Sequence, residues 1–388
     1  MVSYNNWVTN GIPYALVIIF AIAFLFFGNR IATANMVVHE YESPANTYQA
    51  RITRHISTVE HSSAFDEWQV FSFEAEIISR GERRGEIVSF TQSTRGAFYE
   101  RFSRVAREGD RIMLVLTAAG TWNFIDFVRI HSVAILGIVF VVLLIIFGRL
   151  KGFNSVVSLG LTGLAVFLVF IPSVLSGRNI YISAILVCIY AIVVTLFVIN
   201  GVNKKSVAAV AGCLGGVLAA GILTLVMSGT LELTGVTQSE SRVLLTLPLE
   251  NPIDLNAIIF AGIIIGAVGA IMDIAVSISS ALWELKTQMP QASFNDIFKS
   301  GITIGKDIMG SSINTLVLAY IGSSLTVVLF LLSHSGSLMR ILNRELVLVE
   351  LLQAIIGGFG IFLTMPLTAL ICAFLFSRLS LTNSKKIV

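Results

Sequence analysis

Long hydrophobic runs alternate with short polar segments along most of the chain, and only residues 30–130 follow a different pattern. Apolar helices of about 17–25 residues are long enough to cross the hydrocarbon core of a bilayer. The pattern therefore predicts an α-helical integral membrane protein with about eight transmembrane helices. The predicted spans lie at 12–27, 131–148, 154–175, 180–200, 206–228, 255–281, 306–332 and 351–377.

Residues 30–130 carry frequent charges and short, partly alternating segments rich in β-branched and aromatic residues. The segments are "YQARITRHISTV", "WQVFSFEAEIIS", "GEIVSFTQ", "DRIMLVL" and "WNFIDFVRI", with turn signals at "RGERRGE" and "REGD". Such alternation indicates strands, and about five of them predict a small barrel or sandwich. We therefore expect three parts: a first helix in 1–29, a β-rich domain in 30–130 and a seven-helix domain in 131–388.

The first hydrophobic run, 12–27, is predicted to remain in the protein as a membrane helix. A secretory signal peptide usually begins with basic residues and ends at a small-residue cleavage site. The first ten residues here contain no Lys or Arg, and the run ends in "FFGNR".

The composition agrees with a membrane protein. Hydrophobic residues make up 55% of the chain and charged residues 13%, and the mean hydropathy is +0.85, whereas soluble domains carry about 25% charged residues. All three cysteines, Cys188, Cys213 and Cys372, lie in hydrophobic runs, where we expect them buried and unpaired. In 30–130 acidic residues are interspersed with basic ones, so we expect a solvated surface and no nucleic-acid partner.

Lys and Arg in the short loops predict the orientation, because cytoplasmic loops are enriched in them. With the N-terminus inside, the cytoplasmic segments hold Arg149, Lys151, Lys204, Lys205, Lys286, Lys299, Arg378, Lys385 and Lys386. The opposite short loops hold fewer: Arg178, Arg242, Arg340 and Arg344. We therefore expect both termini on the cytoplasmic side of the plasma membrane and the β-rich domain outside.

One aspartate, Asp273, lies within the otherwise uncharged segment "AGIIIGAVGAIMDIAVSISSAL". Helical spacings of three and four residues place it in one stripe with small and polar residues. The stripe comprises Gly262, Gly266, Gly269, Asp273, Ser277, Ser280 and Glu284. Small residues let another helix approach closely, and an intramembrane carboxylate costs about 2.5–3.5 kcal/mol, so we expect the stripe to face the interior of the helix bundle.

The next predicted helix carries a second polar face. Within "SGITIGKDIMGSSINTLVLAY" the residues that share one side are Thr303, Asp307, Ser311 and Asn314, and a neighbouring small-residue edge comprises Gly301, Gly305 and Ser312. In antiparallel neighbours Asp273 and Asp307 lie at comparable depths, so these two with Asn314 and Lys306 are candidates for one polar cluster. Asp307 also has a structural interpretation, because a helix N-terminus favours an anion.

Two interpretations of the carboxylates remain open. In the first, Asp273 and Asp307, with Asn314, Glu284 and Lys306 nearby, handle a proton or cation, since intramembrane ionisable residues commonly mark such paths. In the second, they hydrogen-bond neighbouring helices and stabilise packing. In both, the glycines with Ser277 and Ser280 form the helix-packing part of the stripe.

Two other local patterns indicate structure. The glycines of 206–228 that give this helix a small-residue packing surface are Gly212, Gly215, Gly216 and Gly221. In "PQASFNDIFKS", Ser293 and Asp296 have the spacing of a capping box, which predicts that a short helix begins there.

The sequence lacks the common catalytic and metal-binding motifs. It has no Walker-type glycine loop, no HExxH motif and no paired-cysteine metal site. His131 and His334 lie near predicted helix ends, where an interfacial position is the expected one. We therefore predict that the protein is not an enzyme and uses no cofactor or metal.

The block "GIIIGAVGAIMDIAVSISSALWELK", followed by "FKSGITIGKDIMGSSINTLVLAYIGSS", resembles the YibE/F family of bacterial membrane proteins. "NKKSVAAVAGCLGGVLAAGIL" and "GGFGIFLTMPLTALICAF" are also similar, and so is the order of one helix, an external β-rich domain and a helix bundle. The family consists of uncharacterised multi-pass proteins, largely from Gram-positive bacteria. The resemblance implies a multi-pass membrane protein and brings no substrate or catalytic residue.

A weaker similarity links the chain to the SecD/SecF and resistance–nodulation–division exporters. They also combine an external domain with a bundle whose middle helix carries an aspartate, followed by an acidic helix end and a glycine-led polar helix. Residues in a comparable order here are Asp273, Glu284, Gly301, Asp307 and Asn314. The analogy implies proton use, although the eight predicted helices differ from the six-helix unit of those exporters.

These observations favour a proton- or cation-coupled transporter or exporter. The alternative is an assembly or signalling scaffold, in which the external domain binds a partner and the carboxylates serve packing. A membrane enzyme has the least support. As partners we expect the lipid bilayer, an unidentified extracytoplasmic ligand, and a second copy or a paralogous membrane subunit, since small-residue surfaces suit helix association.

Overall fold

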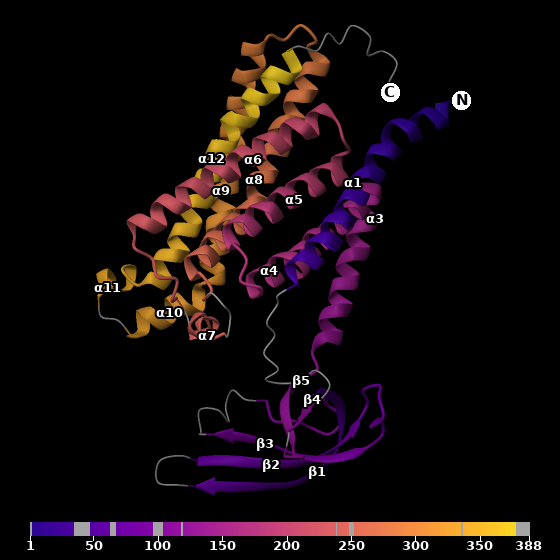
Figure 1. Cartoon of the computed structure of the whole chain (residues 1–388), viewed down its shortest axis with the longest axis vertical. Helices are drawn as coiled ribbons and strands as arrows, with labels where there is room; N and C mark the ends of the chain where they lie inside the picture. Colours follow the sequence, from indigo (N-terminus) through magenta and orange to yellow (C-terminus); the bar gives the residue numbers. More distant parts are fainter. Residues whose placement is uncertain are drawn as a thin grey trace. The chain divides into compact units, whose positions relative to one another are not determined.

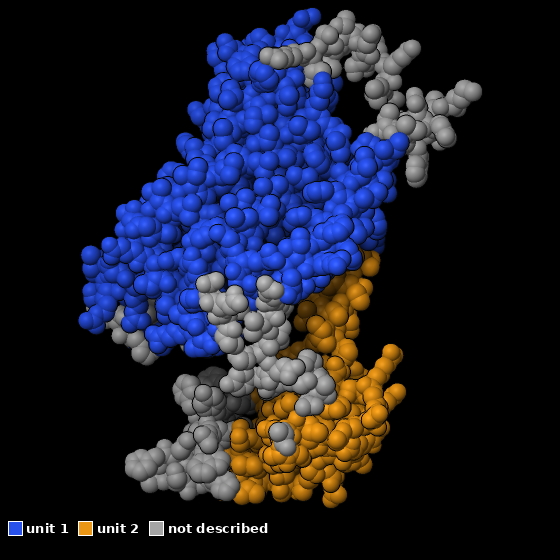
Figure 2. Space-filling view, in the orientation of Figure 1, with its two compact units in different colours: residues 1–38, 144–388 blue, residues 39–143 orange. Residues whose placement is uncertain are grey.

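The computed structural model combines long helices with one small barrel and divides into two compact units (Figure 1, Figure 2). One unit consists of residues 1–38 and 144–388, and the other of residues 39–143. Each has a hydrophobic core of its own. The structure describes residues 2–34, 47–62, 67–95, 104–117, 119–237, 239–247, 252–334 and 337–377.

Five strands form a closed barrel in the second unit, in the order β1-β2-β3-β5-β4. Their bounds are Thr47–Ser62 (β1), Glu67–Ile77 (β2), Ile87–Arg95 (β3), Arg111–Leu116 (β4) and Trp122–Phe127 (β5). All neighbouring strands are antiparallel except β3 and β5, which are parallel. The five predicted strands are confirmed, and of the two predicted forms the barrel is the one observed.

Alternation of apolar and polar residues builds the barrel, because successive strand residues point to opposite faces. In β1, Ala50 and Ile52 are buried and Arg51 between them is exposed. Inside, the ring centroids of Phe73 and Phe90 lie 5.6 Å apart. At the end of β5, a hydrogen bond from the Phe127 amide lowers the pKa of Asp126, and the nearby Arg129 adds to this effect.

The larger unit consists of helices. One of them, α3, begins in the barrel unit and continues into the larger unit. The long ones are α1 (Val2–Ala32), α3 (Ile130–Ala165), α5 (Ile180–Asn200), α6 (Lys204–Thr230), α8 (Leu255–Gln288), α9 (Phe294–Ser323) and α12 (Glu345–Ser377). The short ones are η2 (Val166–Phe170), α4 (Ile171–Leu175), α7 (Ser239–Leu245), α10 (Leu325–His334) and α11 (Leu338–Leu342). Within the described ranges, six helical stretches are long and apolar enough to cross a membrane: Gly11–Ala32, Ile130–Leu175, Ile180–Asn200, Lys204–Thr230, Leu255–Gln288 and Glu345–Ser377.

The stretch Ile130–Leu175 contains a reversal of the chain. Arg149 has φ 50° and ψ −130°, which interrupts the helix. Gly152 packs directly on the backbone carbonyl of Leu144, although eight residues of straight helix would separate the two by about 12 Å. The chain therefore turns back at Arg149, and this break separates the predicted runs 131–148 and 154–175.

The prediction of one helix over 306–332 is wrong. The capping box at Ser293 is confirmed, with the Ser293 amide donating to the Asp296 carboxylate over 2.9 Å, but it starts the long helix α9 and not a short one. Gly322, Ser323 and Ser324 end α9 before α10 begins, since glycine and serine favour helix ends over helix interiors. α9 is not among the six apolar stretches of the described chain.

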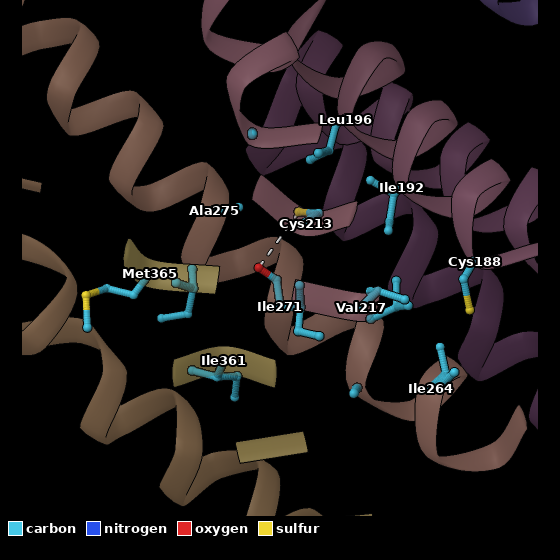
Figure 3. Close-up of a cluster of buried hydrophobic side chains, with 14 of the residues drawn as sticks. Cys188, Ile192, Leu196, Cys213, Val217, Ile264, Ile271, Ala275, Ile361 and Met365 are labelled. Carbon is cyan, nitrogen blue, oxygen red and sulfur yellow. Dashed lines mark hydrogen bonds between the residues drawn. The ribbon is translucent and has the colours of Figure 1, made fainter. Parts of the chain in front are cut away.

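Helix α8 is the centre of the helical unit and packs against α5, α6, α9 and α12. Figure 3 shows part of this core, whose labelled residues are Cys188, Ile192, Leu196, Cys213, Val217, Ile264, Ile271, Ala275, Ile361 and Met365. The Cys213 thiol lies 3.9 Å from the Ile271 carbonyl. All three cysteines are buried and unpaired, as predicted.

The packing role predicted for the glycines of α6 is confirmed. Each lies against a side chain of a neighbouring helix: Gly212 against Thr368, Gly215 against Leu367, Gly216 against Thr364 and Gly221 against Ile264. The first three contacts join α6 to α12, and the last joins it to α8. Glycine is needed here because it allows two helix backbones to approach closely.

Lys286, assigned above to a cytoplasmic loop, is a buried residue near the end of α8, with 2% of its surface exposed. Its Nζ donates hydrogen bonds to the carbonyls of Pro290, over 2.7 Å, and Ala292, over 3.1 Å. These bonds hold the turn between α8 and α9. The ammonium group therefore has a structural role, whereas the sequence predicted only a positive charge in a loop.

We expect Lys286→Met to lower the free energy of unfolding by about 1–3 kcal/mol, because two carbonyls of this turn lose their donor. Thermal unfolding of the purified protein in detergent measures the effect. Lys299→Met, which removes an exposed ammonium group from the start of α9, is the matched control. An equal loss in both variants would show that the two hydrogen bonds are not responsible.

Candidate functional site

The predicted polar stripe of α8 lies on the open side of this helix and not in the interior of the bundle. Gly262, Gly266, Gly269, Asp273 and Glu284 are exposed, and Ser277 and Ser280 are half-buried. The opposite faces of α8 carry fully buried aliphatic residues such as Ile271 and Ile278. Because aliphatic burial is more favourable than burial of a carboxylate, α6 and α12 cover the aliphatic faces and leave the stripe open.

Only part of the stripe serves helix packing within the chain. A Cβ at Gly266 would lie 2.6 Å from the Tyr320 hydroxyl of α9, and a Cβ at Gly262 would lie 3.4 Å from the Gln353 amide nitrogen of α12. At Gly269, next to Asp273, no described atom lies within 4 Å of such a Cβ. Close packing therefore ends before the level of the aspartate.

Helix α9 has the same division into a packed face and an open polar face. Gly301 lies against Ala369 and Gly305 against Met365, so the small-residue edge predicted from the sequence meets α12. The exposed face carries Thr303, Lys306, Asp307, Ser311 and Asn314. The strongly two-sided pattern explains why α9 forms a long helix although it is less apolar than its neighbours.

The register of α8 and α9 places their polar faces at the same level. A Cβ at Gly301 would lie 3.0 Å from Leu282, and one at Gly305 3.2 Å from Ile278, while Gly266 meets Tyr320 further along. The helices are thus antiparallel, and this register puts Asp273 level with Ser311 and Ser277 level with Asp307. The structure therefore brings Asp273 and Asp307 to neighbouring helices, about one helical turn apart in depth.

No direct interaction joins the two carboxylates. Among the described residues, Asp273, Asp307 and Lys306 form no hydrogen bond or ion pair through their side chains. Asn314 is likewise without a side-chain hydrogen bond in this part of the chain. Glu284 differs, because it accepts a hydrogen bond of 2.9 Å from Gln288 in the last turn of α8. The predicted cluster is therefore two open polar faces and not a closed network.

A model of the YibE/F-like protein family matches residues 136–378. The chain belongs to the YibE/F-like family. The match includes α5 to α12, and therefore both carboxylates, and it begins after the barrel. No curated protein and no solved structure matches the chain. The family is uncharacterised, so membership assigns no activity to this YibE/F-like protein.

The open carboxylates of this YibE/F-like protein constrain their surroundings. An ionised side chain at the centre of a bilayer costs about 2.5–3.5 kcal/mol on insertion scales. Lipid offers no hydrogen-bond donor to offset that cost, and one chain leaves Asp273 and Asp307 exposed. In a bilayer, their faces would need water or another protein surface beside them.

A second site, which the sequence analysis missed, is a cavity of about 300 Å³ where α5 and α8 begin. Its lining includes Arg178, Asn179, Tyr181 and Asp254. Asn179 and Asp254 cap the two helices, accepting hydrogen bonds of 3.0 Å from Ile182 and 3.1 Å from Ala257. The signal in the sequence was an N-cap residue directly before each apolar run.

Proposed function

We propose that this YibE/F-like protein is a proton- or cation-coupled membrane transporter in which Asp273 and Asp307 carry the coupling ion. One observation supports this most: two unpaired carboxylates lie within about one helical turn of each other in depth, about 6 Å, on the open faces of adjacent antiparallel helices. A carboxylate without a fixed partner can bind and release a proton or cation, whereas a packing anchor requires a hydrogen-bond partner.

The proposal places six or more helices across the plasma membrane, with both termini in the cytoplasm and the barrel outside. The excess of Lys and Arg in the cytoplasmic loops supports this orientation. Asn314, Glu284 and Lys306 are assigned to the surroundings of the two aspartates. The cavity beside Arg178 then lies on the external side, at the end of α8 remote from Lys286.

The test is ion flux through the full chain in liposomes that contain a pH-sensitive dye. An imposed proton, Na⁺ or K⁺ gradient is the probe, because the transported substrate is unidentified. We expect the native chain to move protons in response to a gradient, and Asp273→Asn to reduce this movement at least about tenfold, a loss of about 1.4 kcal/mol or more. Asp307→Asn should also reduce it.

The matched control is Asp296→Asn, which removes an exposed carboxylate from the start of α9. It should leave the flux unchanged. Native flux in Asp273→Asn would contradict the assignment of the coupling site. Flux no greater than that of empty liposomes under all three gradients would reject coupling to these ions.

The alternative function is a scaffold whose barrel binds an external partner. Its support is the separately closed barrel, which exposes apolar side chains such as Ile56, Val59 and Ile87 on its surface. In a scaffold the carboxylates would serve packing, so Asp273→Asn would lower the unfolding temperature. Transport requires the opposite result, an unchanged unfolding temperature with lost flux.

A further inference from the structure

The helical unit exposes two kinds of surface. Most long helices expose aliphatic and aromatic side chains, for example Phe26 of α1, Ile222 of α6 and Ile355 of α12. The exception is the adjoining open side of α8 and α9, here named the α8–α9 polar face. It comprises Gly269, Asp273, Thr303, Lys306, Asp307, Gly310, Ser311 and Asn314, all exposed.

The α8–α9 polar face is unlike a surface that contacts lipid. Charged and polar residues inside membranes normally face other helices or water, yet these side chains are exposed in the described chain. A membrane-embedded chain therefore requires water or a further protein surface beside this face. Glycine at positions 269 and 310 leaves the backbone open to close approach, since no described atom lies within 4 Å of a Cβ at either position.

The charges on this face indicate what covers it. Lys306 and Asp307 are adjacent, exposed and without ion-pair partners among the described residues, and Asp273 adds a second acid. On a face that carries both signs of charge, a two-fold rotation can bring the lysine of one copy to an acid of the other. A purely acidic face would instead repel its own copy.

We propose that two copies of this chain pair through the α8–α9 polar face. Lys306 of each copy meets Asp307 or Asp273 of the other as an exchangeable counter-ion, which a bound proton or cation displaces. Gly269 and Gly310 form the points of closest approach. Pairing shields the charged side chains from lipid and places the carboxylates of both copies along one shared interface. The proposal relies on the membrane placement given above but not on ion coupling.

Cysteine cross-linking in native membranes tests the pairing. Gly269→Cys and Gly310→Cys introduce thiols where a side chain has room, and a short bis-maleimide is the probe. The matched control is Gly160→Cys, since Gly160 of α3 is also exposed with no described atom near its Cβ, but lies among apolar residues. The unsubstituted chain, whose three cysteines are buried, gives the background.

We expect a dimer band for Gly269→Cys or Gly310→Cys that is several-fold stronger than for Gly160→Cys. In the Gly310→Cys background, Lys306→Asp should weaken the band, and the swap Lys306→Asp with Asp307→Lys should restore it. A band no stronger than the control would overturn the proposal. A product of a different mass from a dimer would also overturn it, in favour of another subunit.

Single-molecule photobleaching of the unsubstituted chain, fluorescently labelled and extracted with its native lipids, removes any dependence on how the variants fold. Two bleaching steps per particle are expected, and one step throughout would contradict pairing. Neither experiment measures ion flux. Failure of the flux test with successful cross-linking would reject coupling alone, and the reverse result would reject pairing alone.

Discussion

Gly152→Ala is expected to strongly reduce the amount of folded protein in membranes, because it blocks the reversal of the chain at Arg149. A Cβ at residue 152 would overlap the carbonyl oxygen of Leu144 and lie 2.9 Å from its carbonyl carbon and 3.3 Å from the Cα of Ile145. All three are backbone atoms, so no side-chain rotation relieves the overlap. We expect the free energy of unfolding to fall by about 3 kcal/mol, at the upper end of the usual cost of overpacking.

Size-exclusion profiles of a fluorescent fusion, together with the unfolding temperature, measure this effect. Gly148→Ala is the control, since it lies on the other side of Arg149 and has no described atom within 4 Å of the added Cβ. It should keep the native profile. A native profile for Gly152→Ala as well would show that the two halves of α3 do not pack in this way.

Gly216→Ala is expected to separate α6 from α12. The added Cβ would overlap the Thr364 hydroxyl and lie 3.1 Å from the Gly360 carbonyl oxygen. The Thr364 hydroxyl already donates a hydrogen bond of 2.6 Å to that carbonyl, so moving it away breaks the bond. We expect destabilisation of about 2–3 kcal/mol.

A double variant separates this overlap from other effects of alanine. Thr364→Ala removes the overlapping atom, so Gly216→Ala combined with Thr364→Ala should unfold at a higher temperature than Gly216→Ala alone. Gly229→Ala, in the last turn of α6, meets no described atom and is the control. If the double variant were less stable than either single variant, the proposed contact would be incorrect.

These packing contacts explain the position of the candidate site. α6 and α12 pack closely together through Gly212 and Gly216, and both cover the aliphatic faces of α8. The polar stripe of α8 is left on the remaining side, where Gly266 meets Tyr320 of α9 and Gly262 meets Gln353 of α12. Loss of the α6–α12 contact should therefore alter the position of α8 and of Asp273.

The sequence predicted much of the local structure correctly. The five strands, the runs at 180–200 and 206–228, the buried cysteines and the Ser293 cap are all confirmed. Each depends on interactions between residues close together in the chain, such as alternation, helical periodicity or capping. The resemblance to the YibE/F family is confirmed by the match over 136–378.

The errors concern features that the hydropathy along the chain does not report. The helix over 306–332 was misplaced because hydropathy follows the average polarity of a segment, whereas α9 is set by its cap and by an apolar side that packs on α12. Lys286 was assigned to a loop because the predicted hydrophobic run ends at 281, before this residue. Its carbonyl acceptors become visible only when the turn after α8 is folded.

The sequence by itself determined the long apolar helices, the small β-rich domain and the helical face that contains Asp273. Periodicity is a property of one helix, so it identifies which residues share a face but not what lies opposite that face. Only the tertiary structure decided that α6 and α12 cover the aliphatic sides of α8, and that Asp273 and Asp307 remain open within about one helical turn of each other. The physical reason is that the face of a helix that becomes buried depends on how all the helices pack together.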